Sequence, residues 1–81
     1  MERLIAAIED VIFVVEDRGD GARLMEIWSD GFRSDTQHDS IVDACKRAED
    51  WWEVELHWDR LAPDVRDVKA HAQKMFSAVK A

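Results

Sequence analysis

The sequence contains one cysteine, one proline and three glycines, and these scarcities exclude several classes of protein. Cys45 is alone, so the chain cannot form an intrachain disulfide, which fits a reducing compartment. The longest uninterrupted apolar run, Val11 to Val15, is far shorter than the ~20 residues that a membrane-spanning helix needs. The first residues, Met1 to Leu4, lack the basic and apolar regions of a signal peptide. We therefore expect a cytoplasmic protein with no membrane partner.

The chain also lacks internal repeats, low-complexity tracts and linkers. Hydrophobic residues make up 47% of its 81 residues, which is typical of a globular protein. A chain of this length supports one hydrophobic core. The sequence therefore predicts a single α+β domain over residues 1–81.

Basic residues are few outside the C-terminal quarter. The formal net charge is −7; residues 1–59 hold sixteen acidic and six basic side chains, whereas residues 60–81 hold two and five. Proteins that bind nucleic acid gain affinity from clustered lysine and arginine, so direct nucleic-acid binding by this acidic body is disfavoured. The same charge attracts a protein partner with a basic surface.

The N-terminal segment allows two interpretations. Leu4, Ile5 and Ile8 share one side of a 3.6-residue period, which favours a short helix over residues 2–9. The β-branched and aromatic run from Val11 to Val15 then favours a strand. A single helix over residues 2–17 is the alternative, but it would place Phe13 on the polar side.

The next residues predict an antiparallel meander. Arg18 to Gly21 has the composition of a turn, and residues 22–29 follow as a strand. The dipeptide Asp30-Gly31 is a strong hairpin signal, after which Phe32 to Thr36 forms a third strand.

The second half predicts two helices around a strand. Asp39 or Ser40 is suited to cap a helix that runs to about Asp50. Residues 52–58 alternate apolar and polar without exception, which is typical of a strand with one buried face. Pro63 suits the first turn of a last helix. The expected sheet, a three-stranded meander plus the strand at 52–58, thus packs against an N-terminal short helix, a central helix and a C-terminal helix.

No residue pattern predicts a catalytic, cofactor or metal site. Glu53, Glu55 and His57 align on one strand face, but a solvated face of an amphipathic strand has this composition. Cys45 lies on the apolar face of its helix, where a cysteine usually acts as a small hydrophobe. The Gly19-x-Gly21 pair lacks the further glycines and the lysine of a phosphate loop. We therefore expect a protein that is not an enzyme and has no cofactor.

The tryptophans carry more information, because four of them is a large number for a chain of this size. Trp52 and Trp58 share the predicted buried strand face with two aliphatic residues, so they are expected in the core. Trp51 points the other way, beside Glu53 and Glu55. It is either an exposed anchor for a partner or covered by a helix.

Carboxylates near the turns form the strongest collective feature. In a meander the two turns lie at opposite ends, and the loop after the third strand returns toward the first turn. The predicted partner-binding residues are Glu16, Asp17, Asp20, Asp30, Asp35, Asp39, Trp51, Glu53 and Glu55. Solubility alone would account for a net charge of this size; the functional alternative is a surface that presents carboxylates to a basic partner.

The order of these elements, a short helix, a meander with an Asp-Gly turn and then helices, resembles that of some small acidic anti-CRISPR proteins from phages. Those proteins imitate the charge of DNA and occupy the nucleic-acid groove of a nuclease. The resemblance implies an inhibitor that occupies a basic surface of its partner. The alternatives are an immunity protein or antitoxin against a basic toxin, and an adaptor that docks or homodimerises through its tryptophan-bearing sheet.

Overall fold

The computed structural model describes residues 2–80, with side chains up to Ser77, and its elements form an α+β fold. They are β1 (Arg3–Ile8), β2 (Val11–Asp17), β3 (Ala22–Trp28), β4 (Arg33–His38), α1 (Ile41–Trp52), β5 (Asp59–Arg60) and α2 (Val68–Lys80). All strand pairs are antiparallel, and the order across the sheet is β4-β3-β2-β1-β5. The expected fold class is therefore confirmed, but the described residues hold two helices instead of three.

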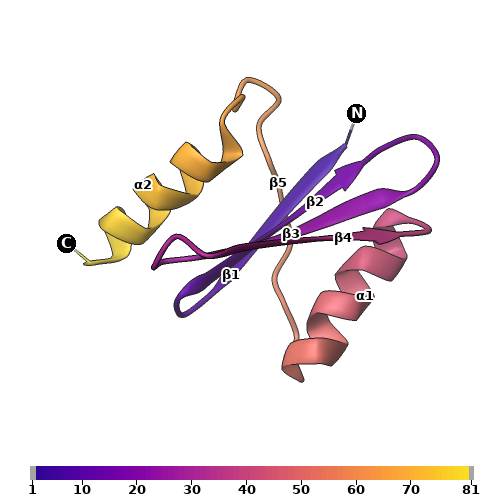
Figure 1. Ribbon diagram of the computed structural model, residues 1–81, viewed down its shortest axis with the longest axis horizontal. Helices are drawn as coiled ribbons and strands as arrows, with labels where there is room; N and C mark the ends of the chain where they lie inside the picture. Colours follow the sequence, from indigo (N-terminus) through magenta and orange to yellow (C-terminus); the bar gives the residue numbers. More distant parts are fainter. Residues whose placement is uncertain (1, 81) are drawn as a thin grey trace.

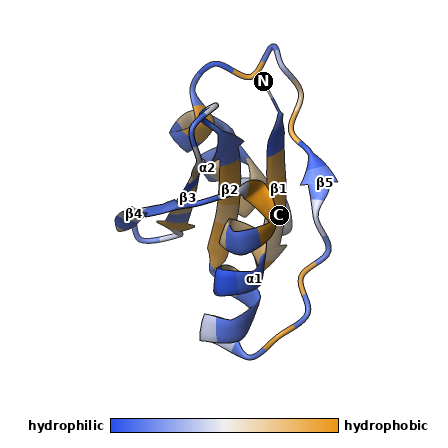
Figure 2. Ribbon diagram, turned by 90° about the vertical axis from the view of Figure 1, so that its right-hand side faces the viewer, coloured by the Kyte–Doolittle hydropathy of each residue, from blue (hydrophilic) through white to orange (hydrophobic). Residues whose placement is uncertain are grey.

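The two helices cover opposite faces of the sheet (Figure 1). The central strand β2 shows why both are needed. Phe13 and Val15 pack on the α1 side, Ile12 and Val14 pack on the α2 side, and all four are at most 1% exposed. A continuous apolar run is typical of a strand that is buried on both faces. Figure 2 shows the apolar residues gathered on the inner strands, whereas β4 is hydrophilic.

The predicted N-terminal helix over residues 2–9 is wrong, and so is the alternative helix over 2–17. Leu4 and Ile8 face α1, while Ile5 faces α2, so the apolar period is two residues. The strand is joined to β2 by a two-residue turn, Glu9-Asp10, in which Glu9 has a φ of 44°. Because this turn contains neither Gly nor Asn, it lacks the usual hairpin signal.

The two predicted turns with glycine are confirmed. Gly19 and Gly31 have φ values of 85° and 97°, which glycine adopts without steric cost. Gly21 is needed for a different reason, because a Cβ atom there would lie 2.6 Å from the carbonyl oxygen of His38.

The expected cap of α1 is confirmed, since the Ser40 hydroxyl accepts a hydrogen bond of 3.1 Å from the Asp43 N–H. The helix continues two residues beyond the expected Asp50, to Trp52. Glu53 ends it in the left-handed conformation, with φ 53° and ψ 43°, and such a residue commonly terminates a helix.

The predicted strand at 52–58 is wrong. Trp52 belongs to α1, and the chain then runs without regular structure until it pairs with β1 at Asp59–Arg60 alone. Leu56 is buried on the α1 side and Leu61 on the α2 side. The segment therefore crosses from one face of the sheet to the other beside β1. Its alternation reflects anchoring residues along a crossing segment, which cannot be distinguished from a strand by period alone.

The last helix begins later than predicted, so Pro63 lies in the preceding turn and not in the first turn of α2. Asp67 caps α2, because its carboxylate accepts a hydrogen bond of 3.0 Å from the Ala70 N–H. Ala72 and Phe76 are the buried residues of α2 on the sheet. Among the described side chains, none of the basic residues of α2 forms an ion pair with the acidic body.

The two edges of the sheet differ. Only β5 pairs with the outer edge of β1, whereas β4 has no neighbour on its outer side within residues 2–80. The backbone N–H of Trp28 donates a hydrogen bond of 2.8 Å to the backbone carbonyl oxygen of Phe32. Hydrogen-bonded and non-hydrogen-bonded pairs alternate along an antiparallel ladder. The outward backbone groups of β4 therefore belong to Arg33, Asp35 and Gln37.

Neither helix of the described residues has the length and the apolar stretch of a membrane-spanning segment.

The element order removes the basis of the anti-CRISPR resemblance, because the described chain opens with a strand and not with a short helix.

Candidate protein-binding surface

The structure divides the predicted carboxylates among three places. Asp17, Asp20 and Asp39 lie together at the β2–β3 end of the sheet, where they line two adjoining hollows. The predicted return toward the first turn is thus observed for Asp39 but not for Asp35, which lies within β4 opposite Met25. Asp17 is engaged in the turn itself, because its Oδ1 accepts a hydrogen bond of 2.9 Å from the Gly19 N–H.

Glu16 and Asp35 lie on the α2 side of the sheet and are neutralised by arginines. Glu16 Oε1 is 3.6 Å from Arg18 Nη1 and 3.7 Å from Arg23 Nη1. Asp35 bonds Arg23 at 3.0 Å and Arg33 at 3.3 Å. Partial burial raises the pKa of Asp35, but the hydrogen bonds and charges of the two arginines outweigh burial and hold that pKa below its ordinary value. These two carboxylates are committed to intramolecular pairs.

Asp30, Trp51, Glu53 and Glu55 lie near the opposite end, around the β3–β4 turn and the C-terminus of α1. Trp51 is 68% exposed. Of the two interpretations of Trp51, exposure is therefore the observed one, although the residue sits on a helix and not on a strand. Asp30 stabilises its turn by accepting a hydrogen bond of 3.0 Å from the Phe32 N–H.

An aromatic groove lies between α1 and the β3–β4 hairpin. It has a volume of about 330 Å3. Its lining consists of Leu24, Glu26, Trp28, Phe32, Ser34, Thr36, Arg47, Ala48, Trp51 and Trp52. Trp28 packs 5.2 Å from Trp52 and 6.4 Å from Phe32, measured between ring centroids. Phe32 remains 60% exposed, so the groove is lined with rings that the fold itself leaves open.

Glu26 places a carboxylate in the groove. Alternation along β3 puts it on the α1 side, between Leu24 and Trp28. Its Oε1 accepts a hydrogen bond of 3.0 Å from Trp52 Nε1. Within residues 2–80 the Glu26 carboxylate makes no ion pair. A half-buried carboxylate thus lies among aromatic rings without a positive partner.

Two further hollows continue the surface around the end of α1. One shares Trp28 and Trp52 with the aromatic groove and extends to Glu9, Asp10 and Val54. The other joins Val54 to four carboxylates, those of Glu49, Asp50, Glu53 and Glu55. We call the exposed and half-buried apolar residues of this region the tryptophan surface; they are Trp28, Phe32, Trp51, Trp52 and Val54.

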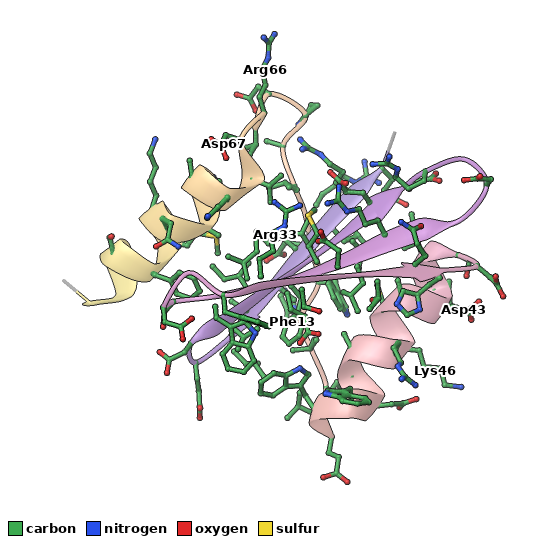
Figure 3. The ribbon with its side chains drawn as sticks, in the orientation of Figure 1. Phe13, Arg33, Asp43, Lys46, Arg66 and Asp67 are labelled. Atoms are coloured by element: carbon green, nitrogen blue, oxygen red, sulfur yellow. The ribbon has the colours of Figure 1, made fainter. Side chains whose placement is uncertain are left out.

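The carboxylates beside the tryptophan surface are placed against the electrostatic preference of the helix. The C-terminus of a helix carries partial negative charge and is stabilised by cations. The last turn of α1 has no basic residue, and Glu49, Asp50 and Glu53 lie there instead. Figure 3 shows Asp43 and Lys46 pointing outward from α1. The end of α1 therefore carries an excess of negative charge beside exposed rings, although Glu49 also accepts a hydrogen bond of 2.9 Å from the Leu56 N–H.

The prediction from sequence missed Glu26, Phe32 and Arg47. Signals for two of them were present. Glu26 interrupts an otherwise apolar strand face, and Arg47 precedes Trp51 by one helical turn, which is the spacing of interacting pairs. The Arg47 guanidinium carbon lies 5.1 Å from the Trp51 ring centroid. Phe32 had no such signal, because its exposure depends on how α1 crosses the hairpin.

The cysteine thiol and the potential metal ligands provide weaker evidence for a functional site than the aromatic groove does. Burial and the charges of Glu49 and Glu2 raise the pKa of the Cys45 thiol to about 11. Because the thiolate is the nucleophilic form, Cys45 is poorly reactive at neutral pH. Within the described part of the chain, no group of three or more His, Cys, Asp or Glu residues is arranged to hold a metal ion.

Comparisons with protein-family models, with curated proteins and with solved structures find no significant match to this chain.

Proposed function

We propose that this protein is a non-enzymatic, cytoplasmic binding protein that occupies a basic surface of a partner protein and so inhibits it. The observation that carries the proposal is the tryptophan surface. Trp51, Phe32 and Val54 account for three of the four large exposed hydrophobic residues among the described side chains, and carboxylates border them. Apolar patches of this kind are typical of protein-binding sites, and Trp is enriched where interfaces gain most affinity.

The charge beside the patch supports a basic partner. The carboxylates at the end of α1 oppose the helix dipole, which costs about 0.3–1 kcal/mol each at exposed positions. A cationic partner surface, such as a nucleic-acid-binding groove, would remove this cost. Asp50→Asn should therefore raise the free energy of unfolding slightly while it weakens partner binding, and urea denaturation together with binding measurements checks both directions.

Affinity capture from the native host, at low and at high salt, tests the proposal. We expect Trp51→Ala to abolish capture of the partner and Asp50→Asn to weaken it. Val42→Ala is the matched control, because Val42 is 73% exposed at the other end of α1. Capture should fall steeply between 50 and 500 mM salt as the screening length shortens. Capture that survives high salt and the Trp51→Ala change would refute the proposal.

The open edge of β4 favours a second candidate, an adaptor that homodimerises by adding the β4 strand of another copy. Here association would resist salt and would be lost on Gln37→Pro, which removes an outward N–H and leaves the bonds to β3 in place. Light scattering at several protein concentrations distinguishes this candidate, since the inhibitor needs no self-association.

A further inference from the structure

Resting on the proposed function, we propose that the aromatic groove is a receptor for one cationic side chain of the partner, an arginine or a lysine. The charge of that side chain would lie among the rings of Trp28, Phe32 and Trp51 and pair with the Glu26 carboxylate. The proposal thus names the chemical group that the tryptophan surface recognises.

The size of the groove limits what can enter it. Its volume of about 330 Å3 is at the low end of the range for small-ligand sites. A single long side chain fits such a space, and a helix or strand does not. Ser34 and Thr36 on β4 line one wall, where the Thr36 hydroxyl is hydrogen-bonded to His38 Nε2 at 2.8 Å.

Charge determines the kind of side chain. Glu26 uses Oε1 for Trp52 Nε1, and within residues 2–80 its Oε2 accepts no hydrogen bond. A partly buried carboxylate is stabilised most by a charged donor. The surrounding rings attract cations to their faces. Both features select a guanidinium or an ammonium group.

The chain already holds one cation on a groove ring. Arg47 lies over Trp51 at 5.1 Å, which shows that the ring accommodates a guanidinium. Arg47 also repels an incoming cation, while Asp43 and Asp50, one turn away on either side, offset part of its charge. Arg47 is therefore a competitor of the ligand and not a contact for it.

An anionic ligand such as a nucleotide would need Arg47 as a contact, whereas a cationic side chain is repelled by it. A nucleotide would stack its base on the rings and place its phosphate against Arg47. Glu26 would then face an anionic ligand, and the net charge of −7 would oppose binding. The observations favour the cation, and the effect of changing Arg47 distinguishes the two classes.

Calorimetric titration of the full chain provides the test, with capped nonapeptides in which serine alternates with arginine, lysine or glutamate, and with a short oligothymidine. We expect the arginine and lysine peptides to bind and the glutamate peptide and the oligothymidine not to bind. Glu26→Gln keeps an acceptor for Trp52 but removes the charge, so affinity should fall about tenfold. Arg47→Gln should tighten binding about threefold.

Asp64→Asn is the matched control for Glu26→Gln, because it removes one exposed negative charge from the turn before α2, which covers the other face of the sheet. It should change affinity less than twofold under screening salt. Equal losses of affinity for Asp64→Asn and Glu26→Gln would overturn the proposal, as would weaker binding by Arg47→Gln or no binding of the arginine peptide. The proposed function fails separately, if capture of the partner survives both high salt and the Trp51→Ala change.

Discussion

The two faces of the sheet are both apolar and both covered by a helix, but they are built differently. On the α1 side, Phe13 is surrounded by Trp52 and Trp58, with ring centroids at 5.8 and 6.4 Å. On the α2 side, Phe76 packs among aliphatic residues and is 8% exposed. All ring pairs in contact among the described side chains lie on the α1 side. The aromatic layer that forms this core therefore also supplies rings of the tryptophan surface.

The largest predicted difference follows from removing one ring on each face. Phe13→Ala should lower the free energy of unfolding by about 4–5 kcal/mol, because a cavity and two edge-to-face contacts are lost. Phe76→Ala should cost about 3 kcal/mol. Urea denaturation followed by circular dichroism measures both. If the alanine variants do not fold, Phe13→Leu and Phe76→Leu give the same ranking. Equal losses of unfolding free energy for the two variants would contradict the predicted difference between the two faces.

The labelling rate of the Cys45 thiol reports on the environment of the α1 side. With a pKa of about 11 against an ordinary value of 9.0, its thiolate population at pH 8 is about a hundredfold below that of an unfolded thiol. We expect iodoacetamide labelling of the native protein to be slower by that factor and to keep rising with pH beyond 9. Folding raises this pKa, so its stabilising effect is present below pH 9 and is lost as the pH rises through 11. A labelling rate that levels off near pH 9 would disprove the shift.

Removing the N-terminal caps of α1 and α2 allows the two helices to be compared for their effects on stability and on partner binding. Ser40→Ala and Asp67→Ala each remove a side-chain acceptor at a helix N-terminus, and each should cost about 1 kcal/mol of unfolding free energy. Only Ser40→Ala should also weaken partner binding, because α1 carries Trp51 and α2 lies on the other face. Binding losses of equal size for the two variants would place part of the interface on α2.

Asp35 gives the smallest expected effect and belongs to the α2 side. Its pKa is lowered by Arg23 and Arg33, so the stabilisation it provides is present above the ordinary pKa of 3.8 and disappears as the pH falls through the lowered value. Asp35→Asn should therefore flatten the loss of stability between pH 5 and pH 2. Acid titrations of the two proteins, followed by circular dichroism, check this. Identical acid transitions would show that the arginine pairs contribute nothing.

Sequence reasoning identified the elements with strong local signals. The strand at Val11, the Asp30-Gly31 turn and the Ser40 cap are each determined by neighbouring residues, and all are confirmed. The N-terminal strand was missed because Glu9-Asp10 makes a tight turn without glycine. The strand at 52–58 was wrongly predicted because an αL residue, Glu53, ended the helix where no glycine marked it.

The tryptophan surface was only partly predictable. Trp51 and the carboxylates near it are visible in the sequence, since composition reveals them. The other predicted carboxylates lie elsewhere: one group is at the opposite end of the sheet, and Glu16 and Asp35 are paired with arginines. These positions depend on strand register. The groove itself requires α1 to cross the β3–β4 hairpin, which brings Trp51 to Phe32. Contacts of that kind are tertiary, and no local pattern encodes them.

The contact between β5 and β1 has a consequence for the order of folding. Strands β1 to β4 are joined by short turns, whereas Arg60 pairs with Leu4 and Leu61 bonds Arg3 at 2.9 Å. Contacts between residues far apart in the sequence require a large loop to close, and so they form slowly. We expect the four-stranded meander with α1 to assemble first and β5 with α2 to join last. The aromatic groove is then complete before β5 and α2 join the sheet.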